Sequence, residues 1–307
     1  MIGKELLKAA YSTLPFKQSI FEAMRGVGII PPQRLQDKLR FEGILHAQMD
    51  DVQFRMHKGS RGEVLESRIF WQGLGNGWER YSLRMWAVLC RCHDVILDVG
   101  ANTGVYSLLA SAVNPDARIF AFEPIPRIFD RLRSNVELNR FNLSLEPIAA
   151  SNYDGSASMW EPTGFDVSYC GAVNSNLYQD QEVPAHELVI RTNRLDTFAH
   201  SRGLSGLGLV KIDVEGHEPE VIEGMGDFIN QRPTLLFEVW NAEVSSRDIG
   251  SLLETHLKGK GYLFFVTDEE GPFRQTENIR SSDRIKKYTN HVACTEAIAK
   301  QAGLLKG

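Results

Sequence analysis

The residues with the clearest chemical potential lie in a short glycine turn, D-V-G-A-N-T-G at 98–104. The turn ends the apolar run V-I-L-D-V, and ligands of open α/β sheets bind beyond the carboxyl ends of such strands. Gly100 and Gly104 permit a tight turn and a close approach by a ligand. The spacing fits neither G-x-G-x-x-G nor a P-loop. Asp98 disfavours a pyrophosphate and favours an ammonium group, so the turn predicts an amino-acid-bearing cofactor such as S-adenosylmethionine rather than a plain strand–helix connection.

A second carboxylate, Glu123, ends the next apolar run and follows Gly104 by 19 residues. A carboxylate at that place can accept hydrogen bonds from both hydroxyls of a ribose. NAD and S-adenosylmethionine both carry a ribose, so Glu123 predicts a nucleoside-containing cofactor without separating the two. Alone, Glu123 would equally fit a surface glutamate before a proline.

The block K-I-D-V-E-G-H-E at 211–218 places three ionisable residues at alternate positions after a further apolar run. If the chain stays extended there, Asp213, Glu215 and His217 lie on one side of it. Methylation of a hydroxyl on oxygen requires removal of its proton, and histidine can accept a proton near neutral pH. We therefore expect His217 or Asp213 to act as the base and Glu215 to orient it. The alternative, strongest for Glu215 and Glu218, is stabilisation of the next helix N-terminus.

A fourth group of polar residues, E-V-W-N at 238–241, ends another apolar run. Asp213, Glu238 and Asn241 together offer the oxygen ligands that divalent cations prefer. Nothing in their spacing demands a metal, and a strand-end carboxylate bonded to neighbouring backbone explains Glu238 equally well. We therefore assign no metal ligands, although a divalent cation would fit the chemistry.

The elements that must position these residues alternate along the chain from residue 94 onward. Helical spacing of apolar residues recurs at 125–140 and 217–230, each with a proline near its start. Alternating strands and helices predict a parallel sheet with helices on both faces. Two later runs, 261–267 and 290–295, predict an antiparallel edge pair. The five earlier strand-length runs are 95–99, 118–122, 143–149, 207–212 and 234–239.

Residues 1–77 follow another pattern and are interpreted as an extension before a catalytic domain at 78–307. Apolar spacing predicts helices at 3–14 and 16–25, and alternation around Asp50 and Asp51 predicts a β-hairpin at 41–57. We interpret the extension as acceptor-binding or oligomerising, so a homo-oligomer is one expected assembly.

One interval, 151–193, interrupts the alternation because it lacks a clear helical pattern. A long excursion of this kind inside a compact domain is usually a functional loop or an inserted hairpin.

The composition of the chain limits its partners and compartment. Thirty-four basic and 39 acidic residues give a formal charge of −5, which argues against a protein that binds nucleic-acid backbones. No apolar run reaches the length of a membrane span, and no signal-peptide pattern stands at the start. Four cysteines in 307 residues make no disulfide framework. We therefore expect a cytoplasmic protein with reduced thiols and a small-molecule or glycan acceptor.

Four blocks together resemble the FkbM-type S-adenosylmethionine-dependent methyltransferases, in the order of that family and over about half of the chain. The resemblance implies a class I methyltransferase fold, a Rossmann-like, mostly parallel sheet of seven strands whose last strand is antiparallel. It implies that Asp98, Gly100 and Asn102 contact the methionine part of the cofactor and that Glu123 binds the ribose. It also implies that Thr103 belongs to the cofactor site and that Trp78-Glu79 reaches the cofactor. The blocks are V-I-L-D-V-G-A-N-T-G-V-Y-S, F-E-P-I-P, L-V-K-I-D-V-E-G-H-E-P-E-V-I-E-G-M and L-L-F-E-V.

The sequence thus predicts an S-adenosylmethionine-dependent O-methyltransferase that acts on a hydroxyl of a sugar, a glycan, or a glycosylated or polyketide metabolite. Two alternatives remain open at this point. An NAD-dependent oxidoreductase would share the sheet and the ribose carboxylate, and Asp98 and the missing third glycine disfavour it. A catalytically inactive cofactor-binding protein of the same fold is the other, and the intact acidic residues argue against it.

Overall fold

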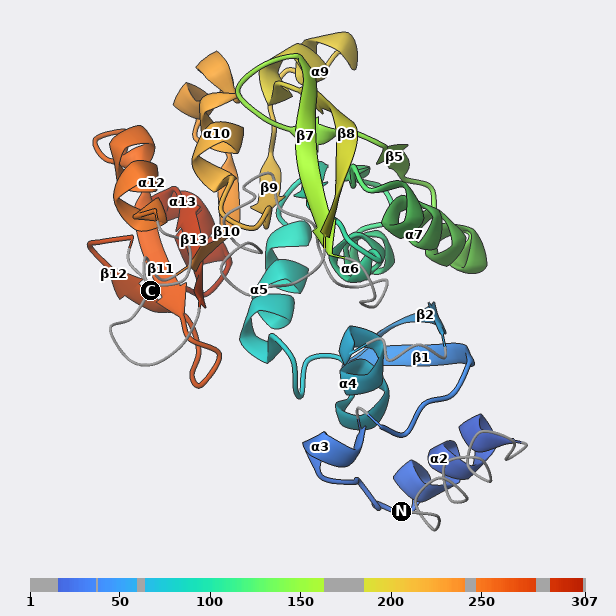
Figure 1. The fold of residues 1–307 in the computed structure, drawn as a ribbon. Coiled ribbons are helices and arrows are strands. Elements are labelled where there is room, and N and C mark those ends of the chain that lie inside the picture. Colours follow the sequence, from blue (N-terminus) through green and yellow to red (C-terminus); the bar gives the residue numbers. More distant parts are fainter. Residues whose placement is uncertain are drawn as a thin grey trace.

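A computed structural model gives the fold (Figure 1). None of the helices that it describes combines the length and the apolar character that crossing a bilayer would require. The structure describes residues 16–36, 38–59, 64–162, 185–240, 247–279 and 288–305.

The centre of the molecule is an eight-stranded sheet in the order β12-β11-β13-β10-β9-β3-β4-β5. The five strands from β10 to β5 are parallel, whereas β13 runs antiparallel to both β10 and β11. This is the class I methyltransferase arrangement that the sequence predicts, with β12 as an eighth strand at the edge. The last two predicted strands do pair, but β13 lies between β11 and β10 and is therefore not at an edge. The bounds are β3 Val95–Val99, β4 Arg118–Phe122, β5 Ser144–Glu146, β9 Leu209–Ile212, β10 Thr234–Trp240, β11 Leu263–Thr267, β12 Arg274–Thr276 and β13 Tyr288–Cys294.

Helices cover both faces of this sheet because successive strand residues point to opposite sides. Ile96 belongs to one buried cluster and Leu97 to the other. The first cluster receives the helices α5 Arg80–Cys90, α6 Val105–Val113, α7 Pro126–Asn139 and α13 Glu296–Gln301. The second receives α9 Leu195–Ser201, α10 Glu218–Glu223, the 3₁₀ helix η1 Gly226–Gln231 and α12 Ile249–Leu257.

The helix predicted at 217–230 is divided into α10 and η1. A side chain at Gly224 would lie 2.0 Å from the carbonyl oxygen of Ser151, so the backbone passes too closely there for another residue type. Gly226 follows with a φ of +52°. The division leaves the predicted apolar stripe intact, since Val221 and Phe228 remain buried in one cluster.

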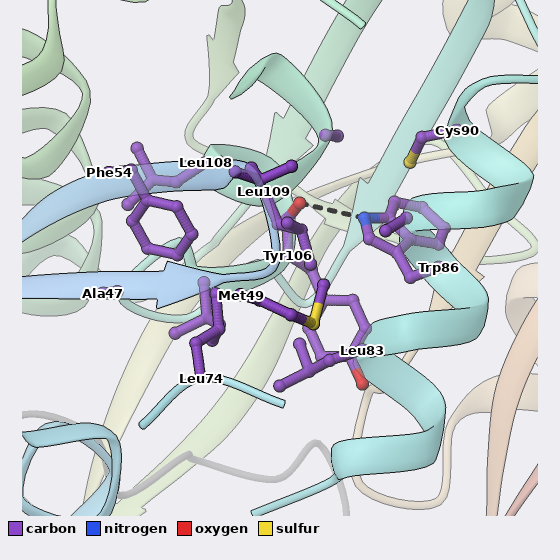
Figure 2. Close-up of a cluster of buried hydrophobic side chains, with 14 of the residues drawn as sticks. Ala47, Met49, Phe54, Leu74, Leu83, Trp86, Cys90, Tyr106, Leu108 and Leu109 are labelled. Carbon is purple, nitrogen blue, oxygen red and sulfur yellow. Dashed lines mark hydrogen bonds between the residues drawn. The ribbon is translucent and has the colours of Figure 1, made fainter. Parts of the chain in front are cut away.

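The N-terminal part packs directly on the sheet domain. Its predicted hairpin is present, and β2 lies against α6 and α7. Figure 2 shows how Phe54 of the hairpin and Trp86 of α5 enter the same buried cluster. The predicted helix at 16–25 is α2, whereas the predicted helix at 3–14 lies outside the described residues. The bounds are α2 Lys17–Gly26, α3 Gln33–Gln36, β1 Gly43–Met49, β2 Val52–Lys58 and α4 Val64–Gln72.

Two asparagines of α7 fix the position of the hairpin. The side-chain oxygen of Asn135 accepts the N–H of His57 at 2.8 Å, while its amide nitrogen donates to the carbonyl of Thr103 at 2.8 Å. Asn139 accepts the N–H of Arg55 and donates back to its carbonyl. The hairpin is therefore bonded through α7 to the glycine turn itself. The predicted domain boundary at residue 77 stays a prediction, and the two parts that it divides pack directly on each other.

The interval 151–193 was expected to be a functional loop or an inserted hairpin, and its described residues form an inserted hairpin. Strands β7 Gly155–Pro162 and β8 Ala185–Asn193 pair antiparallel, and β8 also pairs with β6 Ala149–Ala150. Met159 and Ile190 of this small sheet pack against Ile125 and Ile128 at the start of α7. The hairpin thus adjoins the strand end that carries Glu123.

Candidate active site

The turn at 98–104 has a backbone that explains its residue types. Gly100, Asn102 and Gly104 all have positive φ, at +81°, +51° and +100°. Glycine adopts that region freely, and asparagine is among the few other residues that tolerate it. Gly100 carries a second constraint, because a Cβ there would lie 1.9 Å from the carbonyl oxygen of Asp213. The turn and the loop after β9 therefore touch backbone to backbone.

Glu123 is a buried carboxylate beside this turn. Its two oxygens accept the backbone N–H groups of Asn102 at 3.1 Å and Ile125 at 2.9 Å. Burial raises the pKa of Glu123 to about 7, although both hydrogen bonds oppose that shift. A carboxylate has about four lone-pair positions, so Glu123 retains the capacity to accept further hydrogen bonds from a ligand.

Two clefts open at the carboxyl ends of the parallel strands. The first contains Glu123 and is lined mostly by apolar side chains, and its walls bound about 510 Å³ of space, open solvent at the mouth included. Its lining residues are Val99, Gly100, Phe122, Glu123, Pro124, Ile125, Ile148, Ala149, Ala150, Met159, Asp213, Val214, Glu215 and His217.

The second cleft is larger, at about 760 Å³, and its lining is polar and aromatic. Asp213 and Glu215 line both clefts, so the two spaces adjoin at these carboxylates. The second cleft is lined by Val64, Leu65, Arg68, Trp78, Glu79, Asn102, Asp213, Glu215, Glu238, Trp240 and Tyr288.

A buried lysine organises the charges beneath these clefts. Lys211 Nζ lies 3.0 Å from Asp213 Oδ2, 3.9 Å from Asp98 Oδ1 and 4.5 Å from the centre of the Tyr106 ring. Burial alone would lower the pKa of Lys211, but the carboxylates of Asp213, Asp98 and Glu79 outweigh it and raise the pKa. The lysine therefore stays charged and holds Asp213 at the junction of the clefts.

Glu79 joins the same group of residues from the start of α5. Its Oε2 accepts the Tyr106 hydroxyl at 2.5 Å. Burial and the negative charge of Asp213 raise the pKa of Glu79 to about 8. Glu79 lines the second cleft close to Asn102, which agrees with a position near a ligand held by the glycine turn.

Asp98 and Thr103, both predicted to contact the cofactor, are buried beneath the turn and line neither cleft. Asp98 Oδ2 accepts the Ser107 hydroxyl at 2.5 Å, and its charged neighbour is Lys211. The contact between Asp98 and a ligand ammonium stays a prediction. In the structure, Asp98 supports the turn and Lys211 from below.

The loop at 213–217 is not extended, so that expectation is wrong. Glu215 has a φ of +55° and Gly216 of +93°, and the buried carboxylate of Glu218 accepts the N–H groups of Val214 at 3.1 Å and Gly216 at 3.2 Å. These hydrogen bonds bend the loop back on itself. Glu218 lies in the first turn of α10, as the alternative requires, but these side-chain hydrogen bonds go to the loop before the helix.

The bend separates His217 from the second cleft. His217 lines the first cleft only, where Nε2 lies 3.0 Å from the Ser151 hydroxyl and Nδ1 lies 3.5 Å from Glu220. Burial, partly opposed by Glu220, lowers the pKa of His217. Both ring nitrogens thus have protein partners, whereas Asp213 and Glu215 face both spaces.

The possible cation ligands are only partly described. Glu238 lines the second cleft, accepts the indole N–H of Trp240, and has a pKa that burial and the carboxylates of Asp213 and Glu215 raise well above its usual range. Asn241 lies outside the described residues. Within the described ranges, no cluster of three or more histidine, cysteine, aspartate or glutamate side chains is arranged to hold a metal.

Three residues of the site were not singled out from the sequence. Lys211 gave a signal, since it is a charged residue inside the apolar run L-G-L-V-K-I and two positions before Asp213. Arg68 and Tyr288 gave none, because they reach the second cleft from α4 and β13, elements distant in sequence from the motifs.

Comparison with known proteins agrees with this geometry. Residues 98–286 match the model of the methyltransferase FkbM domain. The chain is 30% identical over 160 residues to the hexuronic acid methyltransferase AglP of Haloferax volcanii, which is 52% of this chain and 61% of that protein. It is 30% identical over 207 residues to the 31-O-demethyl-FK506 methyltransferase FkbM of Streptomyces tacrolimicus, covering 60% and 78% of the two chains. It is 31% identical over 140 residues to the 2-O-methyltransferase NoeI of Sinorhizobium fredii, covering 42% and 56%.

Proposed function

This chain belongs to the FkbM methyltransferase family, and from that premise we propose that it transfers a methyl group from S-adenosylmethionine to a hydroxyl of a sugar, a glycan, or a glycosylated or polyketide metabolite. The observation that carries the proposal is the pair of clefts that adjoin at Asp213 and Glu215. Methyl transfer needs donor and acceptor in line at contact distance, and two adjoining spaces supply that arrangement.

The first cleft fits the adenosine part of the donor. Glu123 can accept both ribose hydroxyls while keeping its two backbone hydrogen bonds. Apolar side chains such as Phe122, Ile148 and Met159 provide the surface that a flat heterocycle requires. The family membership also argues against the NAD-dependent alternative. The main support for that alternative was Glu123, which fits the ribose of either cofactor.

The amino-acid part of the donor would lie toward the glycine turn. When bound, S-adenosylmethionine supplies a sulfonium group whose methyl is electrophilic. Glu79 and Asp213 are the carboxylates that line the space next to Asn102 and can face an ammonium group there. Such a cation beside Glu79 would favour the ionised carboxylate, because an opposite charge lowers the pKa of an acid.

The second cleft fits a polyhydroxylated acceptor. Trp78, Trp240 and Tyr288 offer apolar ring surface, and carboxylates can accept hydrogen bonds from hydroxyl groups. Relatives named for hexuronic acid, for 31-O-demethyl-FK506 and for 2-O-methylation support an oxygen acceptor. Residues Val64 and Leu65 of α4 line this cleft, which supports an acceptor-binding role for the N-terminal extension.

Asp213 is the residue best placed to accept the proton. As the acceptor oxygen bonds to the methyl carbon and the carbon–sulfur bond breaks, the hydroxyl proton passes to a carboxylate that lines both clefts. Lys211 orients Asp213 from below, and Glu215 lies beside the same junction. His217 lines only the cleft assigned to the donor, and its ring nitrogens contact Ser151 and Glu220, so Asp213 is the stronger candidate for the base.

Calorimetry and transfer assays test the proposal separately. S-adenosylhomocysteine should bind to the wild type with 1:1 stoichiometry and NAD should not. Asp213→Ala should retain that binding and lose methyl transfer to a glycan or glycoside acceptor pool, and His217→Ala should show whether the histidine takes part. Binding without transfer to any acceptor would support the inactive alternative, and preferential binding of NAD would refute the proposal.

A further inference from the structure

Arg68 is a charged side chain in the second cleft for which the described residues provide no hydrogen-bond or ion-pair partner. It extends from α4 of the N-terminal part and is half-buried. Its Nε is buried and meets no hydrogen-bond acceptor among the described residues, and these residues form no ion pair with it either. The terminal nitrogens of the guanidinium are not among the buried atoms, so they are the donors that an anion entering the cleft can meet.

The carboxylates around Arg68 do not neutralise it. Glu79 and Glu238 line the same cleft, but burial raises the pKa of both, to about 8 for Glu79 and well above its usual range for Glu238. Burial therefore disfavours the ionised form of both side chains while no cation is bound beside them. Asp213 is paired with Lys211 at 3.0 Å. Glu215 is the remaining carboxylate, and it lies at the junction with the first cleft.

We infer that Arg68 determines acceptor specificity by binding an anionic group, a carboxylate or a phosphate, of the molecule to be methylated. A guanidinium presents paired donors that match the oxygens of both groups. The acceptor class is then an acidic sugar or an acidic glycan, with its hydroxyl toward Asp213 and its anionic group toward α4. This inference rests on the proposed function, since it assigns the second cleft to the acceptor.

The test measures binding of simple probes to the protein saturated with S-adenosylhomocysteine. Methyl glucuronide, glucose 6-phosphate and methyl glucoside are titrated into the wild type, Arg68→Gln and Arg68→Lys. Arg133→Gln is the matched control, because Arg133 is an exposed arginine of α7 that pairs with Asp130 away from the clefts. Binding of S-adenosylhomocysteine is measured first for every variant.

The wild type and the control should bind one of the anionic probes about tenfold more tightly than methyl glucoside, as one charge-assisted pair of hydrogen bonds provides. Arg68→Gln should lose that preference and keep its affinity for methyl glucoside and for S-adenosylhomocysteine. Arg68→Lys keeps the charge without the paired donors, so less than half of the preference should remain. Which anionic probe binds more tightly identifies the group as carboxylate or phosphate.

Equal affinities for anionic and neutral probes in the wild type would overturn the inference, as would failure of both anionic probes to bind. So would a preference that survives in both Arg68 variants. If Arg68→Gln does not fold, the lysine variant decides by the same criterion. Failure of the wild type to bind S-adenosylhomocysteine would instead refute the proposed function.

Discussion

Replacement of Lys211 by methionine should leave the buried carboxylate of Asp98 without its positively charged neighbour. In β3 and β9, Asp98 and Lys211 are partners in the parallel register, and both are almost completely buried. Asp213 loses the same partner, but 29% of its side chain is exposed, so water can screen it. Breaking a buried ion pair by removing one member costs about 3–5 kcal/mol, and we expect a loss of that size in the free energy of unfolding near pH 8.

The loss should depend on pH in a defined direction. Burial raises the pKa of Asp98, and Lys211 opposes the shift, so the variant carries an Asp98 with a pKa raised further. A raised native pKa means that the folded state binds the proton more tightly than the unfolded state does. Stability is then fully present below the unfolded pKa of about 3.9 and falls as pH rises toward the native pKa. The deficit of Lys211→Met should therefore grow between pH 4 and pH 8.

Urea denaturation at several pH values measures this deficit. Lys300→Met is the control, because Lys300 forms an exposed pair with Glu296 and exposed pairs contribute about 0–1 kcal/mol. Adding Asp98→Asn to Lys211→Met should recover part of the loss at pH 8, since the stranded charge is gone. A Lys211→Met deficit below about 1 kcal/mol at pH 8, or one that does not change with pH, would refute the reasoning.

Three further predictions concern the cofactor side and the packing of the extension. Because the pKa of Glu123 is about 7, the affinity for S-adenosylhomocysteine should rise roughly tenfold from pH 6 to pH 8, and calorimetry should show a weaker dependence in Glu123→Gln. Gly100→Ala should lower that affinity at least tenfold through contact with the Asp213 carbonyl, whereas Gly259→Ala, which shares the positive φ and has open space around it, should leave the affinity unchanged. Asn135→Ala should cost about 2–4 kcal/mol in urea denaturation, because it leaves backbone groups of both the hairpin and the glycine turn without partners, and a loss below 1 kcal/mol would contradict that bridging role.

Local patterns predicted the parallel sheet and its glycine turn well. Each strand of the parallel sheet was visible as an apolar run, and D-V-G-A-N-T-G has glycine or asparagine at each of its three positions with positive φ. The extended form expected for 213–217 was wrong because alternation describes a strand, whereas the buried Glu218 side chain bonds the backbone of Val214 and Gly216 into a turn. A side chain that folds back on preceding backbone leaves no periodic signal.

Contacts between strands distant in sequence were not predictable. The position of Asp98 directly before the glycine turn suggests a ligand-binding carboxylate. Only the pairing of β3 with β9 shows that its charged neighbour is Lys211. The second cleft is harder still, because its lining comes from α4, the start of α5, and the ends of β9, β10 and β13. No single segment carries enough of it to form a motif.

The two clefts differ in how they relate to the family domain, and this difference bears on specificity. Every residue lining the first cleft lies between Val99 and His217, inside the matched range 98–286. The second cleft takes Val64, Leu65, Arg68, Trp78 and Glu79 from before that range. Under the proposed function, the shared domain alone encloses the adenosine part of the cofactor. The second cleft, which would take the acceptor and the donor's ammonium beside Glu79, has walls outside that domain that can differ between relatives. The hairpin is bonded through Asn135 to the glycine turn and α4 shares its buried cluster, so the extension packs firmly on the family domain, as the proposed acceptor-binding role requires.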